Sequence, residues 1–510
     1  MSQIKYNKTE NAVRNSIYGI IFRLINLVGA FVVRTMLIHI MGMEFVGLDG
    51  LFSSVLQFLN LAELGFSSAI VFKLYRPMAE QDDEMVCALL TYYRSIYRTI
   101  GIVILLAGLV ILPALPKLVR GDIPDGVSIY ALYLVYLLNT CLSYWLFAYR
   151  TAILSAAQRN DLSTKISSVV LVFKYVVQIV LLLVFRNYYI YVIVIPVAVL
   201  LTNVGNMLIT NKYFPQYRCR GKLEAEDKKE INKKVAALMY NKLGVTLING
   251  SQNIVISSFL GLTLLGIYNS YYYIFSMLYS FFDVFHTAIT GGIGNSIATD
   301  SKEKNYTLFR RIGFVNNWVV SWCSICLLCL YKPFMLIWVG EENSLSHWFS
   351  LLMALYFYFW MVRFLTAIFK SAQGLWVEDR FRAFLEGIAN LILGITLVQF
   401  VGLYGVVIST IVAQLVISLP WETHVLYKKY FELPDKYFYF DFLGRFVVTI
   451  AAGGVTFFLC NCVALAPELT LVIDAVICVF VPNVVFFACY RKTDGFSFLM
   501  NLAQKVLKKK

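Results

Sequence analysis

The stretch Gly42-Met-Glu-Phe-Val-Gly47 has a counterpart 219 residues further along the chain, Gly261-Leu-Thr-Leu-Leu-Gly266. A second pair recurs at nearly the same distance. Thr151-Ala-Ile-Leu-Ser-Ala-Ala-Gln158 and Thr366-Ala-Ile-Phe-Lys-Ser-Ala-Gln373 match at five of eight positions, with a shift of 215. Self-similarity at one period is the mark of a repeated structural unit. The sequence therefore predicts a chain built from two related halves.

The composition of the chain indicates that most of it lies in a lipid bilayer. Of its 510 residues, 59% are apolar and 15% are charged, and the mean hydropathy is +0.70. Soluble domains have about 45–50% apolar and about 25% charged residues. These values exclude an ordinary soluble enzyme.

Apolar runs of eighteen or more residues predict fourteen membrane-spanning helices. Helices satisfy all backbone groups internally in lipid, and no run shows the alternation of barrel strands. The runs lie near 16–41, 46–72, 95–115, 128–157, 162–185, 188–211, 235–260, 264–292, 312–339, 346–372, 383–401, 403–427, 442–466 and 468–490.

The repeat and the spans together predict the domain organisation of an all-α polytopic membrane protein. Residues 1–211 form one six-helix bundle, and 212–234 form a basic cytoplasmic linker. Residues 235–430 form a second bundle, and 431–510 add two helices and a basic cytoplasmic tail. Six is an even number, so the two bundles have the same orientation, with pseudo-symmetry about the membrane normal and a central cavity between them.

The basic residues predict the orientation. The predicted cytoplasmic ends and loops hold 36 Lys and Arg residues, and the outer loops hold four, namely Lys117, Arg120, Arg186 and Lys332. Cytoplasmic loops of membrane proteins carry such an excess of Lys and Arg. Both termini are therefore expected in the cytoplasm. The formal charge of +14 follows from this topology, so no nucleic acid partner is expected.

The ten cysteines do not suggest a disulfide framework, because most lie within apolar runs. Cys323, Cys326 and Cys329 have a metal-like spacing, but they share one apolar span and lack a fourth ligand. We interpret them as small core residues, and no metal site is predicted.

Basic and amide residues inside predicted spans are the candidate binding residues. Charges in a bilayer are costly and are expected to face a water-filled cavity or a partner. Arg23 and Arg34 lie eleven residues apart, hence on one helical face, and Lys242 follows Arg23 by the repeat distance of 219. The alternative is that these charges snorkel to the surface or pair with acids. The candidates are Arg23, Arg34, Lys242, Asn253, Lys174 and Arg363.

Two polar stripes carry the candidate coupling residues. Helical periodicity places the polar residues of span 46–72 within an arc of about 80°, and a shift of 220 places Asp283 of span 264–292 on Glu63. A buried carboxylate beside a cavity can exchange a proton or hold a cation, so a proton or sodium gradient is the candidate energy source, and no cofactor is expected. Equally, these acids can serve only as counter-ions to basic residues. The coupling candidates are Glu63, Asp283 and Asp49, and Glu386 with Asn390 forms a solitary further candidate.

The sequence has two aromatic runs inside predicted spans, and it lacks the common motifs of enzymes. The runs 271–273 and 356–360 can stack on sugar rings, or they can form helix packing and interface belts. The sequence has no phosphate-binding loop, no metal-binding His cluster and no outer acidic pair. No catalytic residue is therefore predicted, and the chain is expected not to be an enzyme.

Several motifs resemble those of a known transporter family. They are the hairpin Gly42 to Gly47, Leu61-Ala-Glu-Leu-Gly65 followed by Leu74-Tyr-Arg-Pro77, Pro333-Phe-Met-Leu-Ile-Trp-Val-Gly340, and Gly402-Leu-Tyr-Gly405. The chain resembles the Wzx-type polysaccharide flippases of the multidrug, oligosaccharidyl-lipid and polysaccharide exporter superfamily.

The resemblance implies the transport of an undecaprenyl-diphosphate-linked oligosaccharide. Such a flippase moves its cargo from the inner to the outer leaflet of the bacterial cytoplasmic membrane by alternating access, for surface polysaccharide biosynthesis. The resemblance also implies a cationic cavity, which Arg23, Arg34 and Lys242 would match. It further implies that the last two helices accommodate the lipid tail. Membrane lipids, a polysaccharide polymerase and glycosyltransferases are the implied partners.

Two alternatives remain from the sequence. An ion-coupled multidrug exporter of the same superfamily would need acidic cavity walls for its cationic substrates. A membrane glycosyltransferase or ligase for a lipid-linked glycan would need a large outer loop with catalytic groups, but the longest predicted outer loop is 116–127.

Overall fold

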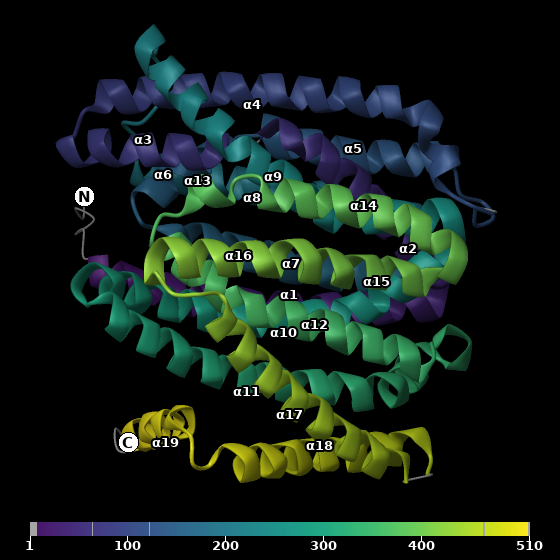
Figure 1. Ribbon diagram of the computed structural model, residues 1–510. Coiled ribbons are helices and arrows are strands. Elements are labelled where there is room, and N and C mark those ends of the chain that lie inside the picture. Colours follow the sequence, from purple (N-terminus) through teal and green to yellow (C-terminus); the bar gives the residue numbers. More distant parts are fainter. Residues whose placement is uncertain (1–7, 64, 122, 463–464, 508–510) are drawn as a thin grey trace. The chain divides into compact units, whose positions relative to one another are not determined.

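The computed structural model describes residues 8–507 except 64, 122, 463 and 464. Its regular elements are helices, with no strand among the described residues, which confirms the all-α prediction (Figure 1). Backbone contacts divide the chain into two units, Met1–Gly266 and Ile267–Lys510. The division predicted at 212–234 stays a prediction. The final three lysines of the predicted basic tail lie outside the described residues.

The chain is a polytopic membrane protein by the length and composition of its helices. Within the described part, eleven helices can cross a membrane, or up to twelve if the bent pair Ile129–Trp145 and Ala148–Ala156 is one span. The two predicted spans outside this set are 46–72 and 264–292. In the first of them, the structure forms a helix over only 17 residues, Met43–Leu59, which is shorter than the roughly 20 residues that usually span a membrane.

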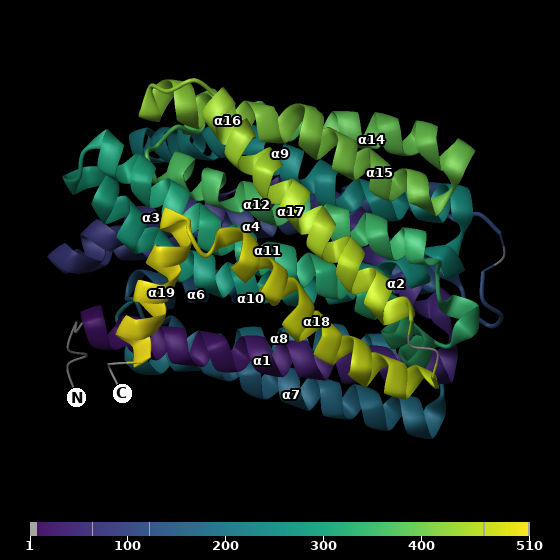
Figure 2. The ribbon, with the colours of Figure 1, turned by 60° about the horizontal axis from the view of Figure 1, so that its bottom comes forward.

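Among its described residues, the first unit contains nine α-helices and three short 3₁₀ segments. In Figure 2, α1 and α7 run side by side, and α7 also contacts α8. The elements are α1 (Lys8–Met41), α2 (Met43–Leu59), η1 (Asn60–Glu63), α3 (Phe66–Glu80), α4 (Asp83–Ile111), η2 (Leu112–Leu118), α5 (Ile129–Trp145), η3 (Ala148–Arg150), α6 (Thr151–Ala156), α7 (Asn160–Phe185), α8 (Tyr188–Tyr213) and α9 (Ala225–Leu260).

Polar side chains at the loop ends fix where several helices begin. The Asp82 carboxylate accepts the Met85 backbone N–H at the start of α4, at 2.9 Å. Asn187 accepts the backbone N–H groups of Tyr189 and Ile190 at the start of α8. Such caps satisfy donors that the first helical turn leaves without partners.

The expectation of one continuous helix over 46–72 is wrong. Helix α2 ends at Leu59, a 3₁₀ turn covers Asn60–Glu63, and α3 begins at Phe66. Gly65 precedes α3 with a φ of 87°, a left-handed conformation that glycine adopts without steric cost. The stripe drawn on one helical wheel therefore does not extend past Asn60, and Glu63 lies in the break rather than on a helix face.

The two glycine motifs turn the chain with a single residue each. Gly42 separates α1 from α2 with a φ of 109°, and Gly261 separates α9 from α10 with a φ of 92°. The two turns also contact each other within the first unit. A Cβ on Gly47 would collide with the Leu262 carbonyl oxygen, and a Cβ on Gly266 would collide with that of Met43. This reciprocal packing explains why glycine stands at equivalent positions of both motifs.

Gly47→Ala is expected to lower the free energy of unfolding by about 1–3 kcal/mol, because a methyl group must displace backbone. Thermal unfolding in detergent micelles measures the effect. Gly454→Ala is the matched helical control, since nothing lies within 4 Å of its Cβ position. The reciprocal contact is refuted if Gly47→Ala unfolds at the same temperature as the control.

The basic segment between α8 and α9 is partly helical and partly docked. Helix α9 begins at Ala225, ten residues before the predicted span start at 235. The Arg150 guanidinium donates to the Tyr217 carbonyl at 2.6 Å, and the Thr91 hydroxyl donates to the Arg220 carbonyl at 3.1 Å. On α3, the Lys73 ammonium donates to Asp227 at 3.2 Å and to Glu230, both on α9. These contacts hold the segment against its own unit.

The second unit contains the remaining long helices. Helix α17 contacts both α11 and α18, and α11 also contacts α18 and α19 (Figure 2). The elements are α10 (Leu262–Thr299), which starts in the first unit, α11 (Lys302–Val339), η4 (Glu341–Asn343), α12 (His347–Ala372), α13 (Trp376–Asp379), α14 (Arg382–Val401), α15 (Leu403–Ala413), the π-helical η5 (Gln414–Ser418), α16 (Leu419–Leu426), the π-helical η6 (Tyr427–Phe431), α17 (Lys436–Asn461), α18 (Pro467–Tyr490) and α19 (Asp494–Leu507).

Candidate functional site

Helix α1 carries two of the predicted basic residues. Arg23 is exposed and Arg34 is half-buried. Between them, the Asn26 side chain accepts a hydrogen bond from the Tyr175 hydroxyl of α7 at 2.7 Å. The Tyr175 ring occupies the space that a side chain on Gly29 would need. The absence of a side chain at Gly29 thus lets α7 approach α1 closely at the level of these residues.

Lys174 of α7 lies beside this contact and close to an acid. It is half-buried, and its ammonium lies 4.5 Å from the centre of the Tyr175 ring. It also interacts electrostatically with Asp49 of α2. The structure therefore brings together two residues that the sequence assigned to separate roles, a binding cation and a coupling carboxylate.

A group of tyrosines surrounds Asp49. The Tyr136 hydroxyl donates to Asp49 Oδ1 at 2.6 Å and lies 3.2 Å from the Tyr188 hydroxyl. Tyr188 stacks on Tyr191 with ring centres 5.6 Å apart. Both Asp49 and Arg34 interact electrostatically with Tyr191. We call Arg34, Lys174, Asp49, Tyr136, Tyr188 and Tyr191 the α1–α7 cluster.

The tyrosines of the α1–α7 cluster were not predicted as site residues from the sequence. They come from α5 and α8, outside the aromatic runs 271–273 and 356–360. Their hydroxyls supply donors and acceptors next to charged groups, so the cluster offers both charge and hydrogen bonding to a polar ligand.

Lys242 and Asn253 of α9 have different surroundings, although they lie eleven residues apart like Arg23 and Arg34. Lys242 is exposed. Asn253 donates to the Gly50 carbonyl at 3.3 Å and to the Ser54 hydroxyl at 2.9 Å, both on α2. Asn253 therefore helps to pack α9 against α2.

Glu63 lies in the break between α2 and α3 and contacts tyrosine hydroxyls. It is half-buried and accepts a hydrogen bond from Tyr97 at 3.2 Å. Tyr97 in turn accepts from Tyr93 at 2.6 Å. A carboxylate next to a chain of hydroxyls has the arrangement needed to exchange a proton or to bind a cation.

Asp283 of α10 is half-buried and lies near a histidine that sequence reasoning missed. The two residues interact electrostatically. The His286 ring is buried, its Nε2 lies 3.0 Å from Asn316 Oδ1, and the ring stacks on Phe364 at 4.2 Å between centres. The spacing of three residues, one helical turn, was the available sequence signal.

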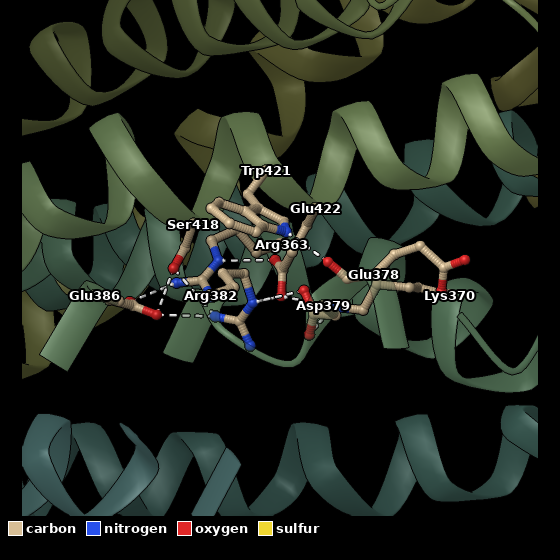
Figure 3. A network of polar contacts seen from close by, with 9 residues as sticks. All are labelled: Arg363, Lys370, Glu378, Asp379, Arg382, Glu386, Ser418, Trp421 and Glu422. Carbon is tan, nitrogen blue, oxygen red and sulfur yellow. Dashed lines mark hydrogen bonds and ion pairs between the residues drawn. The ribbon is translucent and has the colours of Figure 1, made fainter. Parts of the chain in front are cut away.

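Arg363 of α12 belongs to a buried ion network in the second unit (Figure 3). Its guanidinium lies 3.2 Å from Glu386 of α14 and 3.1 Å from Glu422 of α16. Arg382, at the start of α14, lies 2.9 Å from Glu386 and 3.2 Å from Glu422. The two carboxylates thus bridge the same two arginines.

Lys370 and Asp379 extend the network toward α13. The Lys370 ammonium lies 2.6 Å from Asp379 and 3.3 Å from Glu422, and Arg382 lies 3.0 Å from Asp379. The Ser418 hydroxyl accepts from Arg382 and donates to Glu386. We call this group the α12–α16 network. Its members are Arg363, Lys370, Asp379, Arg382, Glu386 and Glu422, with Ser418 as a neutral partner.

The α12–α16 network holds three cations and three anions, so its formal charge is zero. All six charged side chains are at most 12% exposed. Buried charges are tolerated when each is paired and hydrogen-bonded. For Arg363, this arrangement matches the alternative of pairing with acids. The further candidate Glu386 belongs to the same network, whereas Asn390 accepts from Ser409 and Thr410.

The aromatic runs pack mainly inside the second unit. Tyr271, Tyr356 and Tyr358 are buried. Phe275 stacks on Tyr356 with ring centres 4.7 Å apart. These contacts favour helix packing over sugar stacking for the buried members.

Comparisons with known proteins concern the family and the fold. A family described as polysaccharide biosynthesis protein matches residues 12–290. A search of curated proteins finds no match.

Several solved structures are similar to the chain over most of its length. The structure of the lipid II flippase MurJ in an inward closed conformation has a TM-score of 0.65 at 16% identity, covering 94% of this chain and 99% of that one. The structure of an inward-facing multidrug resistance MATE family transporter of the MOP superfamily has a TM-score of 0.60 at 16% identity, covering 81% of this chain and 98% of that one. The structure of a MOP superfamily transporter from Pyrococcus furiosus has a TM-score of 0.54 at 15% identity, covering 82% of this chain and 95% of that one. At these identities the likeness establishes a shared fold.

Proposed function

We propose, since this chain belongs to the polysaccharide biosynthesis protein family, that it flips a polyprenyl-diphosphate-linked oligosaccharide across the membrane by alternating access. The family is one of transporters rather than enzymes, and the chain has the fold of flippases and exporters. In this proposal, glycosyltransferases supply the lipid-linked repeat unit, undecaprenyl diphosphate is the carrier, and a polymerase consumes the flipped product.

The observation that carries this proposal is the α1–α7 cluster. It gathers two cations, Arg34 and Lys174, with tyrosine hydroxyls around one acid, Asp49. A diphosphate offers several anionic oxygens, and arginine binds such oxygens through two parallel hydrogen bonds. A cationic drug would be repelled by this excess of positive charge, so the multidrug exporter is the weaker alternative.

The proposed ligand set is therefore Arg23, Arg34, Lys174 and Lys242. Arg363 is left out of it because it belongs to the charge-neutral α12–α16 network of the second unit, and Asn253 because it packs α9 against α2. Arg23 and Lys242, as exposed residues of α1 and α9, would bind the more distant part of the headgroup.

We further propose fourteen spans, with two six-helix repeats followed by two additional helices. Helices α2–α3 and α10 supply the two spans beyond the twelve found by composition. The MurJ structure covers 94% of this chain and the MATE structure 81%. This difference supports a lipid-linked substrate, with α17 and α18 as the additional helices.

The proposed location is the bacterial cytoplasmic membrane, with both termini and the segment 212–234 in the cytoplasm. The support is the concentration of Lys and Arg on one predicted side. A cysteine introduced at Lys228 should resist an impermeant thiol reagent in intact cells. Labelling of this cysteine from outside the cell would show that the proposed orientation is wrong.

Binding of the carrier headgroup tests the proposed function directly. The purified chain in detergent is expected to bind a polyprenyl-diphosphate oligosaccharide at least about tenfold more tightly than the polyprenyl monophosphate form, since one phosphate group less removes charge-assisted hydrogen bonds. Native mass spectrometry of the protein–lipid complexes measures both. Equal binding of the two lipids, or preferential binding of a cationic dye, would contradict the proposal.

We propose that Glu63, Asp283 and Asp49 couple transport to a proton or sodium gradient. Each is half-buried. Glu63 and Asp49 accept hydrogen bonds from Tyr97 and Tyr136, and Asp283 and Asp49 interact electrostatically with His286 and Lys174. A carboxylate in such surroundings can change its charge during the transport cycle.

Neutral replacements test the coupling. Glu63→Gln and Asp283→Asn are expected to leave the folded protein in the membrane and to flatten the pH or sodium dependence of transport. Glu84→Gln, at an exposed acid of α4, is the control and should keep the wild-type dependence. If both test variants also keep it at full activity, Glu63 and Asp283 serve only as structural counter-ions.

A further inference from the structure

Three cysteines from three helices meet inside the second unit. The sulfur atoms of Cys329 on α11, Cys460 on α17 and Cys478 on α18 all lie within 4.8 Å of one another. Their exposed fractions are 3%, 6% and 1%. The sequence predicts no metal site, and of the three cysteines with a metal-like spacing, Cys323, Cys326 and Cys329, only Cys329 belongs to this cluster.

A buried carboxyl group lies beside the three thiols. Asp474 stands one helical turn before Cys478 on α18 and is 3% exposed. Its carboxyl group contacts the Cys460 thiol, while its Oδ1 has no hydrogen-bond partner within the described part of the chain. An orphaned carboxyl oxygen in an apolar interior is costly, so it calls for a ligand or a proton.

The shell around this group is apolar. Ile325, Ala452 and Phe486 pack against the cysteines. The Trp322 indole N–H donates to the Cys478 carbonyl at 2.8 Å, which fixes α11 against α18 at this level. A dry shell of this kind strengthens bonds between a metal ion and its ligands and limits access of water.

We propose that Cys329, Cys460, Cys478 and Asp474 form a site for a thiophilic d¹⁰ metal ion, Zn²⁺ being the one that fits the donors best. Three sulfurs and one carboxylate oxygen are a four-coordinate donor set for zinc, and soft thiolates disfavour Mg²⁺ and Ca²⁺. With Zn–S bonds of about 2.3 Å, tetrahedral geometry places the sulfurs about 3.8 Å apart. The cluster therefore needs to contract by about 1 Å at most.

The bound ion would join α17 and α18 to α11. Helices α17 and α18 follow the part of the chain that we propose to be repeated. A metal ion with ligands from all three helices would link both of them to α11. Each coordinating thiol gives its proton to solvent when the metal binds, so affinity rises with pH. The site does not depend on the proposed transport function.

Metal binding to the purified full-length chain tests the site. After equilibrium dialysis against ZnCl₂ with a non-thiol reductant, mass spectrometry should find about one zinc per chain. Titration with CdCl₂ should give an ultraviolet sulfur-to-metal charge-transfer band. Asp474→Asn should weaken zinc binding by at least about tenfold, and the triple variant Cys329→Ser, Cys460→Ser, Cys478→Ser should abolish the band.

The control is Cys323→Ser, on the same helix as Cys329 but outside the group of three thiols, which should keep wild-type binding. Because the triple variant can fail to fold, zinc-dependent thermal stabilisation is also compared between the wild type and Asp474→Asn. The proposal is overturned if the wild type retains no zinc, if two of the three thiols form a disulfide, or if a folded triple variant binds as the wild type does.

Discussion

Arg34→Ala is expected to abolish surface polysaccharide and to leave lipid-linked repeat units on the inner leaflet. Arg34 is half-buried on α1 and interacts with Tyr191 beside Asp49. Losing one charge-assisted contact to a diphosphate costs about 2–5 kcal/mol, which corresponds to at least about a 30-fold loss of affinity. Immunodetection of surface glycan and extraction of lipid-linked intermediates measure the two effects.

Three further variants sharpen this result. Arg34→Lys keeps the charge but loses the two parallel hydrogen bonds, so we expect it to impair export as well. Arg23→Ala should impair export in the same direction. Lys212→Ala, at an exposed lysine near the end of α8, is the control and should export normally. Wild-type export by Arg34→Ala and Arg23→Ala, at normal protein levels, would refute the cationic site.

Glu422→Gln is expected to destabilise the protein by about 3–5 kcal/mol, because it leaves buried cations without their counter-ion. Glu422 is 2% exposed and pairs with Arg363, Lys370 and Arg382. The temperature of unfolding in detergent micelles measures the loss. Glu80→Gln, in the exposed pair with Arg76, is the control and should unfold like the wild type.

A double variant separates charge imbalance from loss of contacts. Adding Lys370→Met to Glu422→Gln leaves two cations and two anions in the α12–α16 network, so part of the lost stability should return. If the double variant is less stable than Glu422→Gln by the full cost of Lys370→Met alone, the two residues are not coupled and the network is not the unit that we describe.

Much of the fold follows from local sequence signals. Long apolar runs predict helices because lipid leaves the backbone no other partners, and the glycines of 42–47 and 261–266 mark tight turns between spans. The break between α2 and α3 could not be predicted in this way, because a helical wheel assumes a continuous helix. Gly65 has a left-handed conformation before α3, but a glycine in an apolar run does not by itself show that a helix is broken there.

The partners of the site residues were much harder to predict. Charges inside spans identified Arg363 and Lys174, since buried charges are rare. Nothing in the sequence indicated that Glu422 lies against Arg363, 59 residues away, or that Tyr136 donates to Asp49 across 87 residues. Packing between helices decides such pairs. Cys329 shows the same limit, because the two thiols that lie beside its own, those of Cys460 and Cys478, come from helices far away in the sequence.

Flipping of a diphosphate-linked oligosaccharide by this chain can be measured in proteoliposomes. The purified protein is reconstituted with a labelled polyprenyl-diphosphate oligosaccharide, and a glycan-modifying enzyme added outside reports the accessible fraction over time. We expect the wild type to expose the lumenal pool of this lipid to the enzyme, whereas Arg34→Ala should leave it protected as in protein-free vesicles. Equal protection with and without wild-type protein, under either a proton or a sodium gradient, would contradict the proposed function.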